Sequence, residues 1–179
     1  KPDLVWAKSR TQTYGHMLYD TVRGQKHLNS DTTDAQVSDT QLAFHASDGF
    51  TVATGSGELN DPTGAPNNFV AWCFRAGGNS NTFNIDGTGY SSYDNPQSAN
   101  SSLPASSTSG MITPTGMSIG TKQGCSIVKY SGNSTSGATV AHGLSGLDFL
   151  IVKAFINGSS GDTNWRVYDK SLGATKNLK

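Results

Sequence analysis

The stretch Asp3-Leu4-Val5-Trp6-Ala7-Lys8 lies near the start of the chain and returns in similar form near its end, as Asp148-Phe149-Leu150-Ile151-Val152-Lys153. In both copies an aspartate precedes four apolar residues and a lysine closes the run. This composition is typical of a short β-strand. Because self-similarity at a long spacing is the sign of a repeat architecture, the stretch predicts a structural unit that begins twice in one chain.

A second similarity follows each copy of this stretch. Leu18-Tyr19-Asp20 with Gly24 recurs as Val167-Tyr168-Asp169 with Gly173. The copies are 145 residues apart at the lysines (153 minus 8) and 149 apart at the tyrosines (168 minus 19), so the second copy has four extra residues in its loop. Loops tolerate such variation. We therefore expect one complete unit followed by the opening strands of the next, an arrangement suited to sharing strands with a neighbouring copy.

Length and charge narrow the class of protein. The 179 residues fit one domain with a sizeable core plus an extension. Lysine and arginine together number 13, and so do aspartate and glutamate, which makes the formal net charge zero. A neutral surface releases few phosphate counterions, so we expect no nucleic-acid partner. No apolar run is long enough to span a bilayer, so we expect no membrane partner.

Short β-favouring runs dominate the chain, and helical periodicity is almost absent. The segments between the runs, such as Ser47-Asp48-Gly49 and Ser131-Gly132-Asn133, are rich in turn-forming residues. This pattern predicts an all-β sandwich or barrel of antiparallel strands. The expected strands are Leu4 to Lys8, Met17 to Thr21, Leu42 to Phe44, Phe50 to Ala53, Phe69 to Arg75, Thr82 to Ile85, Ser126 to Tyr130, Thr139 to Ala141, Phe149 to Ala154 and Trp165 to Tyr168.

Two segments differ from this alternation of strand and turn. The run Phe69-Val70-Ala71-Trp72-Cys73-Phe74 is nearly continuous in apolar character, so we expect a central strand, buried on both faces, with the core around it. Residues 86–122 hold few large apolar residues among many Ser, Thr, Ala and Pro, so we expect a long loop or arm that lies on another surface. Cys73 and Cys125 are expected to be buried free thiols, with a disulfide between them as the alternative.

Residues for catalysis by paired acids are scarce. Glu58 is the only glutamate, so the glutamate-rich strand motif of sandwich-type glycosidases is absent. The chain also lacks a nucleophile elbow before a helix and a phosphate-binding glycine loop with its lysine. We therefore predict that the protein is not an enzyme.

Aromatic and histidine side chains near predicted loops are candidates for binding. Trp165, Tyr90 and Tyr93 could stack on a sugar ring or contact a partner protein, and packing inside the fold is the alternative. His142 precedes Gly143, which permits a sharp turn. For His142, a hydrogen bond within that turn is the alternative to a role in the carbohydrate or interface site.

A metal site is the one cofactor hypothesis that the sequence raises. Glu58, Asn60 and Asp61 place oxygen ligands beside a glycine-rich turn, and such ligands suit Ca²⁺. Their spacing is not that of a recognised calcium loop. No other cofactor is expected.

An ordered series of motifs runs through nearly the whole chain. They are Pro2 to Arg10, Leu18 to Gly24, Ser47 to Phe50, Phe69 to Gly78, Asn84 to Tyr90, Ile112 to Gly116, Gly124 to Asn133 and Ala141 to Leu144. In this order they resemble a repeated domain of unassigned activity found in long structural proteins of tailed phages, especially marine ones, and described as tail-fibre-like or lectin-like. The resemblance implies an antiparallel β-sandwich of jelly-roll, concanavalin-like type in an extracellular or virion protein, and it carries no catalytic residues.

The order of motifs in that family also implies a domain organisation. In the family, the segment similar to residues 124–144 directly precedes the segment similar to residues 4–8. Residues 1–85 would then be the main part of the sandwich unit, residues 86–122 the loop or arm, and residues 123–179 the strands that begin the next unit. The sheet at the amino terminus would be incomplete, and the carboxy-terminal segment of a neighbouring copy would complete it by strand addition.

These expectations lead to two hypotheses of function. The first is a structural subunit of an extracellular fibre or virion appendage, which assembles head to tail by strand complementation into a homo-oligomer or polymer. The alternative is a carbohydrate-binding, lectin-like module that attaches to glycans on a host surface.

Overall fold

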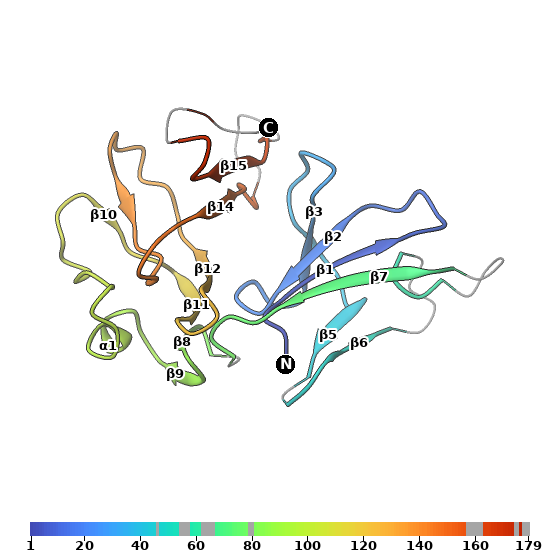
Figure 1. The fold of residues 1–179 in the computed structure, drawn as a ribbon, viewed down its shortest axis with the longest axis horizontal. Helices are drawn as coiled ribbons and strands as arrows, with labels where there is room; N and C mark the ends of the chain where they lie inside the picture. Colours follow the sequence, from blue (N-terminus) through green and yellow to red (C-terminus); the bar gives the residue numbers. More distant parts are fainter. Residues whose placement is uncertain are drawn as a thin grey trace.

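The computed structural model describes residues 1–45, 47–53, 58–61, 67–78, 81–156, 163–173 and 176. These residues form fifteen short strands in five sheets and one helix of four residues (Figure 1). The mostly antiparallel, all-β class predicted from the alternation of strand and turn is confirmed. No helix in these ranges is long and apolar enough to cross a membrane.

The first sheet has five antiparallel strands in the order β4-β3-β2-β1-β7. Because β1 lies between β2 and β7, both of its edges are paired. The expectation that this sheet lacks a partner strand at the amino terminus is therefore wrong. The strands are β1 (Leu4–Ser9), β2 (Met17–Asp20), β3 (Lys26–Asn29), β4 (Val37–Ser38) and β7 (Phe69–Phe74).

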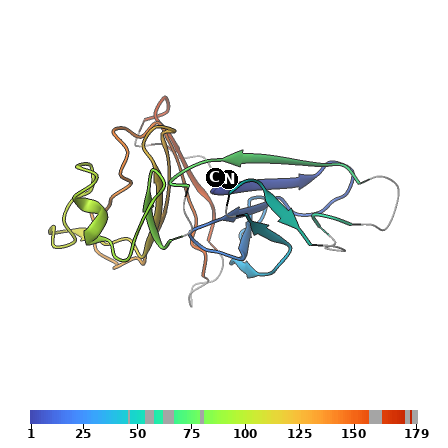
Figure 2. The same ribbon diagram turned by 90° about the horizontal axis from the view of Figure 1, so that it is seen from below.

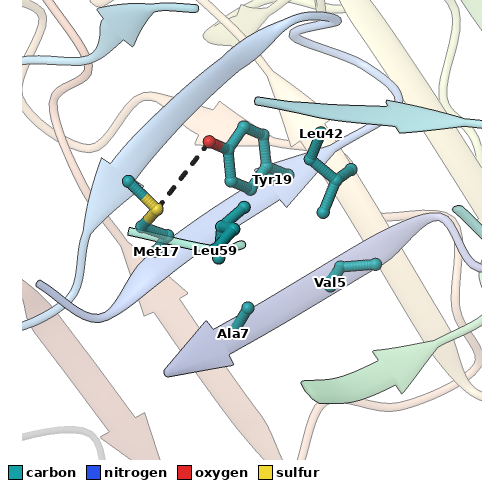
Figure 3. Close-up of a cluster of buried hydrophobic side chains, with 6 residues drawn as sticks. All are labelled: Val5, Ala7, Met17, Tyr19, Leu42 and Leu59. Atoms are coloured by element: carbon teal, nitrogen blue, oxygen red, sulfur yellow. Dashed lines mark hydrogen bonds between the residues drawn. The ribbon is translucent and has the colours of Figure 1, made fainter. Parts of the chain in front are cut away.

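A hairpin covers one face of the first sheet. Alternation in β1 turns Val5 and Ala7 toward this face, and they are buried, whereas Leu4 and Trp6 point to the other side and are partly exposed. The hairpin strands are β5 (Leu42–Phe44) and β6 (Phe50–Val52). The first core cluster, drawn in Figure 3, consists of Val5, Ala7, Met17, Tyr19, Leu42 and Leu59.

The second sheet lies at the opposite end of the molecule (Figures 1 and 2). Its strand order is β12-β11-β8-β9, and β11 runs parallel to β8. Its strands are β8 (Phe83–Ile85), β9 (Thr88–Tyr90), β11 (Gly116–Gly120) and β12 (Cys125–Lys129). Nearby are α1 (Asp94–Gln97) and a short parallel pair, β10 (Met111–Ile112) with β13 (Thr139–Val140). The second core cluster consists of Phe83, Ile85, Tyr93, Leu103, Met117 and Ile119.

Residues 86–122 differ from the expected loop or arm. They contain β9, α1, β10 and β11, and they supply four members of the second core cluster. The large apolar residues are few but widely spaced, and the buried ones converge on the same cluster. Residues 86–122 therefore contribute to a hydrophobic core, although few of them are large and apolar.

β7 also differs from its expected role. Within the described residues it is an edge strand that pairs only with β1, and the side chains of Trp72 and Phe74 are 46% and 44% exposed. The prediction of a central strand buried on both faces is wrong, because a continuous apolar run does not reveal whether a neighbour covers it. Cys73 on this strand is an exposed free thiol and Cys125 is a partly buried one, so the expected burial of Cys73 is wrong too.

A separate two-stranded hairpin lies between the two larger sheets in Figure 1. Three hydrogen bonds tie its flanks to the segment between β3 and β4. Lys153 Nζ donates to the Thr33 carbonyl oxygen (2.6 Å), the Gln36 N–H donates to the Phe155 carbonyl oxygen (2.9 Å), and Trp165 Nε1 donates to the Thr32 carbonyl oxygen (2.9 Å). The hairpin strands are β14 (Phe149–Val152) and β15 (Arg166–Asp169).

Candidate functional site

The β14–β15 hairpin repeats the β1–β2 hairpin in register. Val5 stands opposite Tyr19 in the first hairpin, and Leu150 stands opposite Tyr168 in the second. These pairs occupy equivalent positions in the two sequence copies. The repeat detected in the sequence is therefore also a repeat of strand pairing.

A lysine contact at the loop end of each hairpin also occurs in both copies. Lys8 Nζ donates to the Tyr14 carbonyl oxygen at 2.6 Å, and Lys153 Nζ donates to the Thr163 carbonyl oxygen at 2.6 Å. In both copies the lysine at the end of the first strand thus holds the loop that leads into the second strand.

The aspartate before the first strand closes the other end of each hairpin. The Asp3 carbonyl oxygen accepts the N–H of Thr21 (2.9 Å), and the Asp148 carbonyl oxygen accepts the N–H of Lys170 (2.8 Å). The glycine in the following turn has φ 77° in the first copy and 78° in the second, a conformation that favours glycine.

The side chains of these two aspartates differ in their surroundings. Asp3 is fully buried, and its Oδ2 accepts the backbone N–H groups of Ala76 (2.8 Å) and Gly78 (3.0 Å), just after β7. Its Oδ1 accepts the Thr21 hydroxyl (3.2 Å) and lies 3.3 Å from Ser118 Oγ on β11. Asp3 therefore joins β1, β7 and the second sheet.

Asp148 has a different environment. Its side chain is 79% exposed, and its Oδ1 accepts a hydrogen bond from Lys170 Nζ at 2.7 Å. That hydrogen bond raises the pKa of Lys170. Among the described residues, the second copy thus has the hairpin of the first unit but no strand in the position of β7.

The apolar side chains of β14 are uncovered in the same way. Val5 is fully buried in the first hairpin, whereas its equivalent Leu150 is 38% exposed. Phe149 and Ile151 on the other face are 56% and 44% exposed. In the described part of the chain β14 pairs only with β15, so its second edge has no partner strand.

The predicted binding residues do not form one site. Tyr93 is buried, and its hydroxyl donates to the Pro104 carbonyl oxygen (3.0 Å), which matches the packing alternative. Trp165 is partly buried, and its indole N–H is directed at the carbonyl oxygens of Asn29, at the end of β3, and of Thr32. His142 Nδ1 accepts the N–H of Leu144 (3.2 Å), the turn contact considered as its alternative role.

Tyr90, one of the predicted aromatic residues, lines a depression in the surface. The depression is shallow, has a volume of about 680 Å³ and lies beside the end of β9 and the start of α1. Its polar side chains include Asn95 and Ser91, which are joined by a hydrogen bond of 3.1 Å. Asn95 shares the lining of the depression with Tyr90, although the sequence pattern pointed only to the aromatic residues of this run. The lining residues are Asn81, Thr82, Gly89, Tyr90, Ser91 and Asn95.

Comparison with known families covers both halves of the chain. The family described as a domain of unknown function, DUF7483, matches residues 1–100 and, a second time, residues 97–179. The chain belongs to the DUF7483 family. The first match contains the β1–β2 hairpin and the second contains β14–β15, so the two DUF7483 matches agree with the structural repeat. No curated protein and no solved structure matches the chain.

The acidic residues near Glu58 show no metal-binding arrangement in the described part of this DUF7483 chain. Asp61 Oδ2 accepts the Tyr14 hydroxyl (2.5 Å), a hydrogen bond that raises the pKa of Tyr14. Asn60 Nδ2 donates to the Ala53 carbonyl oxygen (3.2 Å). No group of three or more His, Cys, Asp and Glu side chains gathers within the described residues. The Ca²⁺ site stays a prediction from sequence.

A buried polar network on β2 and β3 was not predicted from the sequence, because no local motif marks it. The Tyr19 hydroxyl lies 3.0 Å from both carboxylate oxygens of Asp39, and His27 Nδ1 is bonded to the same carboxylate. Burial, followed by the charge of Asp39, raises the pKa of Tyr19. Because Tyr19 and His27 are buried, the network anchors the segment before β5 and offers no access to a substrate.

Proposed function

We propose that this protein is a structural subunit of an extracellular fibre or virion appendage and assembles head to tail by strand complementation. The β14–β15 hairpin carries this proposal, since it repeats the register of β1–β2 but has exposed apolar side chains and, among the residues that the structure describes, an unpaired edge. An unprotected, apolar strand edge is a template for pairing with another chain. A homo-oligomer or polymer follows from such pairing.

The fibre context rests on the motif order, which resembles a lectin-like domain repeated in structural proteins of tailed phages. The double match of DUF7483 supports repetition of the unit. We place the protein on a virion or outside the cell on this basis. The completed unit would be an antiparallel sandwich of jelly-roll, concanavalin-like type, which the packing of the β5–β6 hairpin on the first sheet supports.

The proposal is tested by measuring molar mass against concentration. Light scattering on the full chain should show a mass that rises with concentration, and electron microscopy should show linear particles. Ile151→Lys adds a charge at the exposed edge strand and should shift the protein toward monomer. Val52→Lys, at a residue on β6 that is 37% exposed, is the matched control and should assemble like the wild type. A wild-type chain that stays monomeric throughout would contradict the proposal.

The second candidate function is glycan binding at the Tyr90 depression. An aromatic ring flanked by amide and hydroxyl groups is the chemistry that binds sugar rings, with stacking from the ring and hydrogen bonds from the polar groups. A glycan array should then show selective binding that Tyr90→Ala and Asn95→Ala remove. Thr88→Ala, on the same strand but outside the lining, should keep it. Absence of selective binding by the wild type would leave the scaffold function alone.

We do not propose an enzymatic activity. The single glutamate argues against a glycosidase with paired acids, and the scattered aspartates do not form a recognisable motif. Incubation with polysaccharides tests this point, because release of reducing ends that an Asp-to-Asn substitution abolishes would show hydrolase activity.

A further inference from the structure

The depression beside Tyr90 is lined by polar side chains from three segments of the chain. Its volume of about 680 Å³ is in the range of small-molecule sites in proteins. The lining side chains are the Tyr90 ring, the amides of Asn81 and Asn95, and the hydroxyls of Thr82 and Ser91. Among the described residues that line the depression, none carries a charge at neutral pH.

The absence of positive charge extends beyond the lining. From residue 76 to residue 121 the sequence contains no Lys, Arg or His, and its charged residues are Asp86 and Asp94. Asp94 is exposed and directly precedes Asn95 in α1. In the second sheet, Lys129 lies on β12, the edge strand opposite to β9. The segment that forms the depression thus carries negative charge only.

Gly89 makes room for one of the two amides. An alanine Cβ at this position would lie 1.9 Å from Asn81 Nδ2 and 2.5 Å from Asn81 Cγ. The φ of Gly89 is not in the left-handed region, so its backbone conformation does not require glycine. What glycine permits here is the close approach of the Asn81 amide to the backbone of β9. Gly89 therefore sets the position of Asn81 in the depression.

A hydrogen bond holds the second amide. Asn95 Nδ2 donates to Ser91 Oγ at 3.1 Å. An asparagine side chain has two N–H donors and an acceptor oxygen, so Asn95 can bond to Ser91 and to a ligand hydroxyl at the same time. Because this side chain is already held in place, less conformational entropy is lost when a ligand binds.

We propose that the depression binds neutral sugars and discriminates against acidic ones, with Asn81, placed by Gly89, among the residues that contact the sugar. This inference rests on the glycan-binding function proposed above and names the ligand class of that site. Proteins bind carboxylate and phosphate groups with Arg and Lys. In this depression, an acidic sugar would lose hydration without meeting a positive charge, and Asp94 would repel it.

Matched pairs of oligosaccharides test the ligand class. Isothermal titration calorimetry on the full chain compares oligosaccharides of glucose, galactose and mannose with those of the corresponding uronic acids, at the same linkage and length. We expect a neutral series to bind and its uronic-acid counterpart to bind at least about tenfold more weakly. The affinity for the neutral sugar should change less than about twofold between about 50 and about 500 mM NaCl, because no ion pair is screened.

A positive charge added to the lining should change this preference. Thr82 is an exposed residue of the lining. Thr82→Lys should strengthen binding of the uronic-acid oligosaccharide about five- to tenfold, and high salt should remove the gain. Thr82→Gln, with a long neutral side chain, is the matched control and should leave that binding weak. Equal effects of the two variants would overturn the role assigned to charge.

A double-mutant cycle tests the position of Asn81. Asn81→Ala and Gly89→Ala should each weaken binding of the neutral sugar about three- to tenfold. Because Gly89→Ala acts by displacing the Asn81 amide, it should add less than about twofold to the effect of Asn81→Ala. Two effects that multiply would overturn the role of Gly89. If Gly89→Ala does not fold, Asn81→Ala alone decides whether the amide contacts the sugar, and wild-type affinity would overturn that contact.

The outcomes separate the ligand class from the glycan-binding function. If the uronic-acid oligosaccharides bind as tightly as the neutral ones and Tyr90→Ala removes this binding, the function stands and the proposed class is wrong. If none of the oligosaccharides binds to the wild type, both fail.

Discussion

Replacing Asp3 with alanine tests whether this buried carboxylate joins the two sheets. The Asp3 side chain is fully buried and accepts the N–H groups of Ala76 (2.8 Å) and Gly78 (3.0 Å). Alanine would leave both donors without a partner. Because each buried, unpaired donor costs about 1–3 kcal/mol, the free energy of unfolding should fall by about 4 kcal/mol.

Asparagine at the same position should have a smaller effect. Its amide oxygen can accept both backbone N–H groups, while its NH₂ group faces the hydroxyls of Thr21 and Ser118. The lost charge removes about 1–2 kcal/mol, since hydrogen bonds to charged groups are stronger than neutral ones. The order wild type, Asp3→Asn, Asp3→Ala is therefore expected in stability.

The internal repeat supplies the control. Asp148 occupies the equivalent position and is 79% exposed, so Asp148→Ala should shift the urea midpoint by less than about 0.3 M. For a urea dependence of about 2 kcal/mol/M, Asp3→Ala should lower the midpoint by about 2 M. Equal midpoints for Asp3→Ala and Asp148→Ala, measured at a concentration where both are monomeric, would refute the role assigned to Asp3.

Three further predictions follow from local geometry. Gly120→Ala would place a Cβ 2.4 Å from a backbone carbonyl oxygen, so thermal unfolding should show a loss of about 1–3 kcal/mol, whereas Gly146→Ala, with open space around it, should be unchanged. Burial raises the pKa of Tyr19 above its ordinary 10.0, so the unfolded chain ionises first and stability should fall above about pH 10, by at most about 1.4 kcal/mol per pH unit. Urea midpoints between pH 8 and 11 check this, and a Tyr19→Phe variant with the same slope would contradict it. A thiol reagent should label exposed Cys73 quickly and Cys125 slowly, since burial raises the pKa of Cys125, and Cys73→Ser should remove the fast phase.

Some strands could not be predicted, because the local sequence does not show the contacts with distant segments that stabilise them. In β3, Lys26, His27 and Asn29 surround a single leucine, so no apolar alternation is visible. The strand forms because buried His27 is paired with Asp39 from a different segment. That compensation depends on a residue twelve positions away in the chain, so it could not be predicted from the local sequence.

β11 was missed for another reason. Glycines stand at both ends of its sequence, GMSIG, and glycine is unfavourable in strands. All five of its residues are buried, and Gly120 lies so close to the Ala76 carbonyl oxygen that no Cβ would fit. The glycine that weakens the strand signal is the one that permits the close approach of the neighbouring segment.

The candidate site was predictable only in part. Tyr90 was identified from its position in an aromatic and polar run, and it does line a depression. Tyr93 looked the same in sequence but points into the second core. Three positions separate the two tyrosines, and only the course of the chain after β9 decides which ring faces solvent.

Sequence alone determined the repeat, the β-class and the positions of most strands, because apolar alternation and turn residues act between near neighbours. Tertiary structure decided which edges are paired and which apolar residues are covered. Those outcomes depend on segments far apart in the chain, as when Asp3 meets Ser118 across 115 positions. The same aspartate motif is therefore buried in its first copy and exposed in its second, because in the described part of the chain only the first copy has a strand, β7, beside it.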